Sequence, residues 1–141
     1  MPKALGLDYG EKRTGIAITD DLQMIASPLT TVETKMLIPY LEKLFSQEKI
    51  EVMVVGEAKY LNGQASATTA IQQVFATALQ KKFPEKKIVR INEMFTSRMA
   101  AQALVTMGMK KKDRQNKGNL DKVSAALILQ SYLDTKGFIP R

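Results

Sequence analysis

Short apolar runs in the first third of the chain predict three consecutive strands. Lys3–Asp8 is a short apolar run typical of a buried strand, and Thr14–Thr19 is a second one. The few residues between them include Gly10, a spacing that favours an antiparallel hairpin. A third strand is predicted over Met24–Thr31, broken or bent at Pro28, because proline cannot donate a hydrogen bond to a neighbouring strand.

From Thr34 onward, apolar positions at helical spacing alternate with short buried-type runs. Pro39 either lies in the first turn of the first helix or kinks it. The predicted elements are a helix over Thr34–Glu48, a strand over Val52–Gly56, a helix over Ser66–Lys82, a strand over Lys87–Ile91 and helices over Ser97–Met107 and Leu120–Asp134.

This order of elements predicts an α/β fold. Hairpin strands come first and strand–helix–strand units follow, which indicates a mixed five-stranded sheet flanked by helices on both faces. The ribonuclease H-like fold has this order. We found no repeat and no linker, so residues 1–141 are expected to form a single domain.

The residue types that are absent limit the chemistry. The chain has no Cys and no His, which excludes disulfides, thiolate catalysis, imidazole bases and most transition-metal sites. Oxygen ligands from carboxylates suit Mg²⁺ or Mn²⁺ instead. No apolar stretch is long enough for a membrane span, and the N-terminus lacks the features of a signal peptide, so a cytoplasmic location is expected.

The charge balance favours an anionic partner. The chain has 21 Lys and Arg against 14 Asp and Glu, a net charge of +7, so nucleic acid is the first candidate partner. Residues 110–122, KKKDRQNKGNLDK, carry +4 of this charge, and Lys110–Lys117 is expected to be a loop that leads into the last helix. The alternative interpretation is that the surface is basic but binds no particular ligand.

Three carboxylates are candidates for chemistry. Asp8 ends the first strand, where side chains of α/β folds meet ligands, although such an acid is also a common turn residue. Glu93 follows the Lys87–Ile91 strand, where it could equally be a solvated loop residue. Asp121 opens a helix stripe that continues with Ala125, Ile128, Leu129 and Tyr132, so it should face the sheet. With Asn119 as helix N-cap, Asp121 would instead be a first-turn acid stabilised by the helix dipole.

Together these acids predict a metal site. Asp8, Glu93 and Asp121 would hold one or two Mg²⁺ or Mn²⁺ ions, as the carboxylates of nucleases do during displacement at phosphorus. Three carboxylates this close would repel one another without cations. Glu57, at the end of the middle strand, is a possible fourth acid.

The stretch Leu7–Ala17, LDYGEKRTGIA, resembles the signature LDxGxKRxGxA that opens the YqgF/RuvX-type family. The resemblance continues through Val54–Gly56, Leu61–Gly63 and Asp121–Leu129, the last of which matches D-x-x-x-A-A-x-I-L. It implies a ribonuclease H-like fold and Mg²⁺-dependent cleavage of nucleic acid. The role it implies is maturation of the 5′ end of precursor 16S rRNA or, alternatively, resolution of Holliday junctions.

The chain departs from the family pattern in two places. The usual D-E-R stretch is Asn92-Glu93-Met94, which keeps the metal-type acid but replaces the neighbouring acid and Arg. The usual G-L-P after the middle strand is Gly56-Glu57-Ala58. In the related RuvC-type resolvases an acid stands at a comparable strand end, so Glu57 either compensates or is simply exposed.

Two other functions compete with a nuclease. The LDYGEKRTG stretch also resembles the first phosphate loop of actin-like ATPases and sugar kinases, but these need two such domains, and Ile16 stands where a Walker A loop needs Lys. A module that binds RNA without cleaving it is the second rival, although such a module gains nothing from acids beside phosphate. Under either nucleic-acid function the expected backbone contacts are Lys12, Arg13, Arg98, Lys110, Lys111, Lys112, Arg114 and Lys117.

The substrate and the assembly stay open. Precursor rRNA and branched DNA are both possible substrates, and the chain is expected as a monomer or weak homodimer. A dimer would favour the junction, because two symmetric cuts need two sites related by a two-fold axis.

Overall fold

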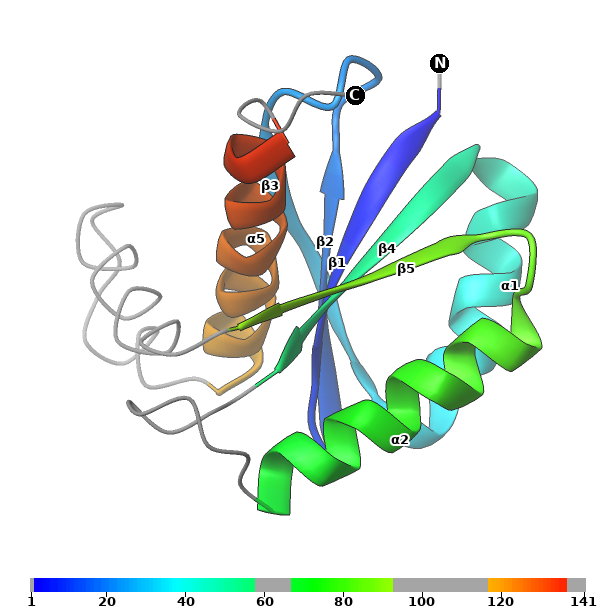
Figure 1. Cartoon of the computed structure of the whole chain (residues 1–141), viewed down its shortest axis with the longest axis vertical. Helices are drawn as coiled ribbons and strands as arrows, with labels where there is room; N and C mark the ends of the chain where they lie inside the picture. The colour runs from blue at the N-terminus through cyan, green and yellow to red at the C-terminus, as the bar shows by residue number, and fades with distance from the viewer. Residues whose placement is uncertain (1, 58–66, 93–116, 137–141) are drawn as a thin grey trace.

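The computed structural model describes residues 2–57, 67–92 and 117–136. Within these ranges a twisted sheet carries helices on both faces (Figure 1). The elements are β1 (Lys3–Tyr9), β2 (Arg13–Thr19), β3 (Ala26–Glu33), the 3-10 helix η1 (Thr34–Met36), α1 (Leu37–Gln47), β4 (Ile50–Glu57), α2 (Ala67–Lys82), β5 (Lys87–Asn92) and α5 (Lys117–Lys136).

The five strands lie in the order β3-β2-β1-β4-β5. The strands β1, β2 and β3 pair antiparallel as a meander, whereas β4 pairs parallel to β1 and β5 parallel to β4. The mixed five-stranded sheet predicted from the sequence is therefore confirmed, with β1 at its centre. Because β1, β4 and β5 run the same way, their carboxyl ends meet at one edge.

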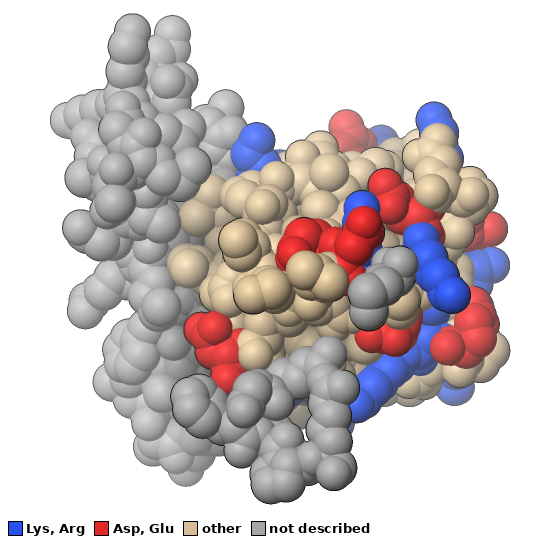
Figure 2. All heavy atoms as spheres, turned by 90° about the horizontal axis from the view of Figure 1, so that it is seen from above, with Lys and Arg blue, Asp and Glu red and all other residues tan. Residues whose placement is uncertain are grey.

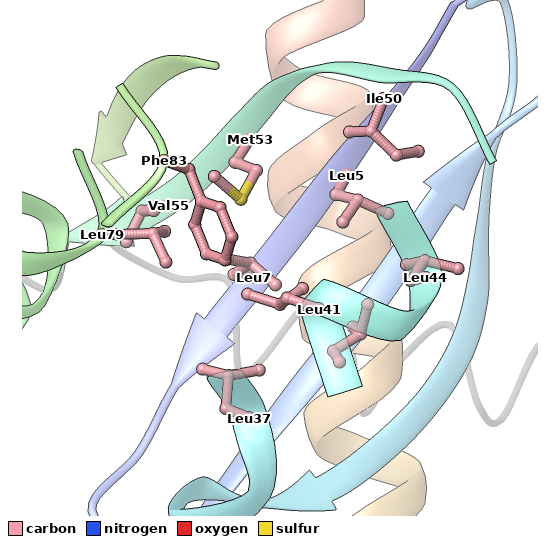
Figure 3. Close-up of a cluster of buried hydrophobic side chains, with 11 residues drawn as sticks. Leu5, Leu7, Leu37, Leu41, Leu44, Ile50, Met53, Val55, Leu79 and Phe83 are labelled. Carbon is pink, nitrogen blue, oxygen red and sulfur yellow. The ribbon is translucent and has the colours of Figure 1, made fainter. Parts of the chain in front are cut away.

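Helices α1 and α2 cover one face of the sheet. Leu37, Leu41 and Leu44 of α1 pack against Leu5 and Leu7 of β1 in a cluster that is almost fully buried (Figure 3). Leu79 and Phe83 close the same cluster from the side of α2.

Helix α5 covers the other face of the sheet. Ala125, Ile128 and Leu129 are at most 1% exposed and pack against Ala4 of β1 and Val54 of β4. The apolar stripe that the sequence predicted for the last helix is therefore confirmed along these residues. Alternation along β1 sends Leu5 and Leu7 to the α1 face and Ala4 and Gly6 to the α5 face, so Asp8 belongs to the α5 side.

Several predicted boundaries were wrong. The third strand begins at Ala26 rather than Met24, and its pairing with β2 shifts beside Pro28, where the sequence predicted a break or bend. Pro39 lies in the first turn of α1, where a backbone N–H has no partner within the helix and proline is tolerated. Helix α5 begins at Lys117, so Asn119 lies inside it and is not its N-cap.

Two further expectations concern the helices. The predicted helix over Ser97–Met107 lies outside the described residues. Among the helices of the described ranges, none combines the length and the apolar character that crossing a membrane requires.

Candidate functional site

The carboxyl ends of the parallel strands form the edge at which the candidate acids were expected. Asp8 is the last residue but one of β1, and Glu57 ends β4. Glu57 pairs in register with Asn92, the last residue of β5. Asn92 therefore lies at the same edge of the sheet as Asp8 and Glu57.

The direction of α5 brings its first turns to this edge. The backbone N–H of Ala26 donates to Oε1 of Gln130 at 3.0 Å, and Ala26 pairs with Thr19 across the β2–β3 ladder. The hydroxyl of Thr19 accepts a hydrogen bond from the amide of Ala4 at 2.9 Å. The later turns of α5 thus lie beside the start of β1, and the earlier turns lie beside its end, as Figure 1 shows.

A close contact between α5 and β1 sets the level of Asp121. A Cβ atom on Gly6 would lie 2.5 Å from the carbonyl oxygen of Ala125 and 2.7 Å from Cβ of Leu129. From this contact, position 121 is four helix residues away, or about 6 Å. Asp8 is two strand residues away in the same direction, or about 7 Å. The backbone of Asp121 therefore stands level with Asp8, on the helix that covers the same face.

The end of β1 is held firmly from the other face. Tyr9, the residue after Asp8, stacks on Phe75 of α2 with ring centroids 4.0 Å apart and an interplanar angle of 14°. Side chains of neighbouring strand residues point to opposite faces. The stacked ring of Tyr9 thus fixes the backbone that presents the half-buried Asp8 toward the α5 side.

The turn between β1 and β2 is anchored beside this acid. The hydroxyl of Thr34 donates to the carbonyl of Gly10 at 2.6 Å, and the amide of Thr34 donates to the carbonyl of Lys12 at 2.9 Å. A Cβ atom on Gly10 would lie 2.6 Å from the carbonyl oxygen of Arg13, so only glycine fits this turn. Exposed Lys12 and half-buried Arg13 are thereby positioned next to the end of β1.

Not every predicted site residue can be placed. The positions of Asp8 and of the backbones of Glu57 and Asp121 agree with a common site, whereas Glu93 lies outside the described residues. Among the described side chains, which do not include those of Glu57 and Asp121, no three acids form a metal-binding group. That the carboxylates of Asp8, Glu93 and Asp121 lie close together therefore stays a prediction.

Of the Lys and Arg residues that were predicted to contact nucleic acid, some lie within the described residues and some outside them. Lys12 and Arg13 stand in the anchored turn, and Lys117 is the first residue of α5 rather than part of a loop. The remaining ones lie outside the described residues: Arg98, Lys110, Lys111, Lys112 and Arg114.

The opposite end of the sheet has a different electrostatic character. There, the backbone amides of Ile25 and Met24 lower the pKa of Asp20, and a hydrogen bond with Glu48 raises the pKa of Lys3. The Lys3 ammonium lies 3.0 Å from the Glu48 carboxylate and 3.7 Å from that of Asp21. Figure 2 looks onto this end, where Lys and Arg side chains lie among Asp and Glu. Lys3 at this end is thus paired with two carboxylates.

The donor set at the carboxyl edge fits a hard divalent cation. Asp8 supplies carboxylate oxygens at a firmly held strand end, and a second acid, Asp121, stands level with it on α5. With no His or Cys anywhere in the chain, oxygen ligands for Mg²⁺ or Mn²⁺ are the chemistry that these residues can offer.

Sequence patterns alone did not single out two residues that build this site. Gly6 permits the close approach of α5, and Thr34 holds the Gly10 turn. A glycine inside a buried strand signals a close backbone approach and could have identified Gly6. Nothing in the local sequence distinguishes Thr34, because its partners are about twenty residues earlier in the chain.

Solved structures share this architecture. RuvC from T. thermophilus in complex with a Holliday junction substrate matches with a TM-score of 0.58 and 15% identity, over 97% of this chain and 96% of that one. The Fowlpox virus resolvase with substrate Holliday junction DNA matches with a TM-score of 0.60 and 12% identity, over 95% and 98%. At such low identity the match establishes the fold alone. The protein is an α/β domain of the ribonuclease H-like fold, as its sequence predicted.

The family follows from closer sequence matches. The family model described as "RuvX: Holliday junction resolvase" matches residues 2–135. A Flavobacterium johnsoniae protein named "Putative pre-16S rRNA nuclease" is 48% identical over 138 residues, covering 98% of this chain and 100% of that protein. A Phocaeicola vulgatus protein of the same name is 45% identical over 139 residues, covering 99% and 100%. The chain belongs to the RuvX family, which confirms the resemblance seen in its sequence.

Proposed function

We propose that this chain is a metal-dependent nuclease that hydrolyses phosphodiester bonds in the 5′-end maturation of precursor 16S rRNA. Asp8, Glu93 and Asp121 are its catalytic residues and metal ligands, and it works in the cytoplasm as a single domain. The observation that carries this proposal is the Gly6–Ala125 contact, which sets position 121 level with Asp8 at the carboxyl edge.

The proposed site divides the work between acids and cations. The three carboxylates hold Mg²⁺ or Mn²⁺, which when bound supplies charge stabilisation for displacement at phosphorus. Lys12 and Arg13, in the turn anchored by Thr34, contact substrate phosphates beside the acids. The substrate follows from the names of the relatives that match over their full length.

Cleavage assays on two substrates test the proposal. An RNA that carries the 5′ leader of precursor 16S rRNA and a four-way DNA junction are each incubated with the chain and Mg²⁺, Mn²⁺ or EDTA. We expect the RNA to be cut with either metal and to stay intact with EDTA. Cleavage that persists in EDTA would contradict metal dependence, and intact RNA in all three conditions would contradict the function.

Junction resolution is the second candidate, favoured by the shared fold with two solved junction resolvases. It requires paired sites, whereas trimming of one RNA end needs only one. Light scattering on the same preparation therefore accompanies the assays. A dimer that makes paired cuts in the junction would favour the second candidate, and a monomer that cuts only RNA would favour the first.

A further inference from the structure

A second basic segment lies between α2 and β5. Residues 81–90, KKFPEKKIVR, contain five basic side chains and one acidic one, so this stretch alone carries +4 of the net +7. Its charge equals that of residues 110–122. Within it, Lys81, Lys82, Lys87 and Arg90 are exposed and Lys86 is half-buried.

The segment borders a groove between the outer side of α2 and the edge strand β5. The groove has a volume of about 360 Å³. Buried Ala76 and half-buried Ile88 provide its apolar part, whereas Lys81 and Arg90 are exposed. Thr77 and Gln80 complete the lining. An apolar floor with cations at its rim suits a chain that alternates charged and less polar groups, as a nucleic-acid strand does.

The wall of the groove is rigid. Gln80 Nε2 donates to the carbonyl of Lys86 at 2.9 Å and to that of Phe83 at 3.4 Å, which fastens the turn between α2 and β5. Lys86 Nζ donates to the carbonyl of Ile50 at 2.6 Å and lies 4.8 Å from the centroid of the Phe45 ring. The turn is therefore held from both sides before any ligand binds.

The other lysines of the segment are not neutralised by described acidic side chains. Across the described ranges, no ion pair involves Lys81, Lys82 or Lys87. Glu85, the acid within the segment, is likewise in no such pair. This differs from the far end of the sheet, where Lys3 is neutralised by Glu48 and Asp21.

The groove lies on the α2 face of the sheet, whereas Asp8 belongs to the α5 face. Arg90 pairs in register with Val55, and Val55 pairs with Leu7, the residue before Asp8. Two strand spacings, or roughly 10 Å, therefore separate the backbone of Arg90 from that of β1. A substrate strand that contacts both Asp8 and the groove passes around the carboxyl end of the sheet, along a path longer than this separation.

We propose that the groove between α2 and β5 binds the phosphodiester backbone of the substrate strand as it leaves the cleavage site, with Lys81 and Arg90 as phosphate contacts. This inference rests on the proposed function. Charge complementarity selects the occupant, because the stretch has a net charge of +4 and three of its lysines form no ion pair within the described ranges, so it attracts a polyanion. The groove offers no readout of base sequence, since its charged groups are cations suited to phosphate.

A pair of double variants with matched charge tests the groove. Lys81→Gln with Arg90→Gln removes two charges from it, and Lys43→Gln with Lys49→Gln removes two exposed charges elsewhere. Binding of single-stranded RNA and of DNA of the same sequence is measured by filter binding in EDTA over a salt series. We expect the groove variant to bind several-fold more weakly, with a slope of log K against log salt reduced by about 1.4. The control variant should change both values much less.

Three outcomes would overturn the proposed role of the groove. They are equal effects in the two variants, a loss of affinity for RNA but not for DNA, or a parent chain that binds neither strand at low salt. A third variant, Lys81→Arg with Arg90→Lys, keeps the charge and should bind like the parent. If this charge-conserving variant binds as weakly as the Gln variant, Lys81 and Arg90 have a structural role and do not contact phosphate. Melting temperatures are compared as well, because lysines in the last turn of a helix also stabilise its dipole.

Cleavage assays separate this inference from the proposed function. With Mg²⁺, the groove variant should show a raised KM and an unchanged kcat, because none of the three proposed acids is altered. A parent chain that binds nucleic acid but never cuts it would overturn the proposed function. The role of the groove would then be decided by the binding of the groove variant relative to the control variant. A parent that cuts, with a groove variant that behaves like the control, would overturn the groove alone.

Discussion

At the scale of single residues, the missing side chain of Gly6 lets α5 lie directly on β1. The 2.5 Å between a Cβ at this position and the Ala125 carbonyl is shorter than a real Cβ contact, and the obstacle is backbone. A methyl group here would push the helix outward. The distance between Asp8 and Asp121 would grow with it.

We therefore predict that Gly6→Ala lowers the free energy of unfolding by about 1–3 kcal/mol, the usual cost of overpacking a core. It should also reduce the rate of metal-dependent cleavage, because it displaces the helix that carries Asp121. Urea unfolding and the RNA cleavage assay measure the two effects. Ser27→Ala, at an exposed position of β3, serves as control and should change stability by no more than about 0.5 kcal/mol. A Gly6→Ala chain as stable and as active as the parent would contradict this role.

Residue types and their spacing are enough to indicate part of the site. Asp8 was predicted because it ends an apolar run, and Asp121 because it begins a helical stripe, of which the structure confirms the positions Ala125 and Leu129. The charge of residues 81–90 can be counted in the sequence, but the groove beside them cannot be predicted from it. The turn that forms its wall is held by Gln80 and by the distant Ile50, and such contacts leave no local sequence pattern.

At the scale of elements, periodicity predicted the order of the strands and helices, and the boundaries depended on side-chain hydrogen bonds. The carboxylate of Asp20 accepts hydrogen bonds from the amides of Met24 and Ile25, at 2.8 and 3.0 Å, which closes the turn and delays β3 until Ala26. The start of α5 was misplaced because a cap-forming residue, Asn119, was taken as the residue before the helix, whereas α5 begins at Lys117. Local cap preference amounts to about 1 kcal/mol, and tertiary contacts readily exceed it.

Helix α5 depends on its buried stripe for attachment to the sheet. We predict that Leu129→Ala, at a position that is 0% exposed, costs about 2–5 kcal/mol in unfolding free energy. The matched control is Val74→Ala on α2, where the side chain is 71% exposed and truncation should cost less than about 0.5 kcal/mol. Chemical denaturation of both variants makes the comparison, and equal costs would contradict the packing of α5 described above.

At the scale of the whole molecule, the positive charge is concentrated in two segments. Residues 81–90 and 110–122 each carry +4, so the rest of the chain is close to neutral. At the far end of the sheet, acids and bases lie side by side (Figure 2). A polyanion should therefore bind through these two segments rather than over the whole surface.

We predict that replacing Lys110, Lys111 and Lys112 by Ala weakens nucleic-acid binding and reduces the salt slope by up to about three units. The loss should be similar for different base sequences, because phosphate contacts carry no sequence information. Filter binding over a salt series measures it, with Lys43→Gln/Lys49→Gln as the charge control. An unchanged slope would mean that these lysines do not contact phosphate.

The central claim is that Asp8, Glu93 and Asp121 form one metal-dependent cleavage site, and Asp121→Asn tests it most directly. Asn is nearly isosteric, so the fold should survive, but a neutral amide oxygen is a poorer ligand for Mg²⁺. One negative charge fewer beside the phosphate path also lowers repulsion. Melting temperature, RNA binding in EDTA and Mg²⁺-dependent cleavage are measured on one preparation of the parent and the variant. We expect a parent-like melting temperature, equal or tighter binding and no cleavage; a variant that cuts RNA as the parent does would contradict the proposed site.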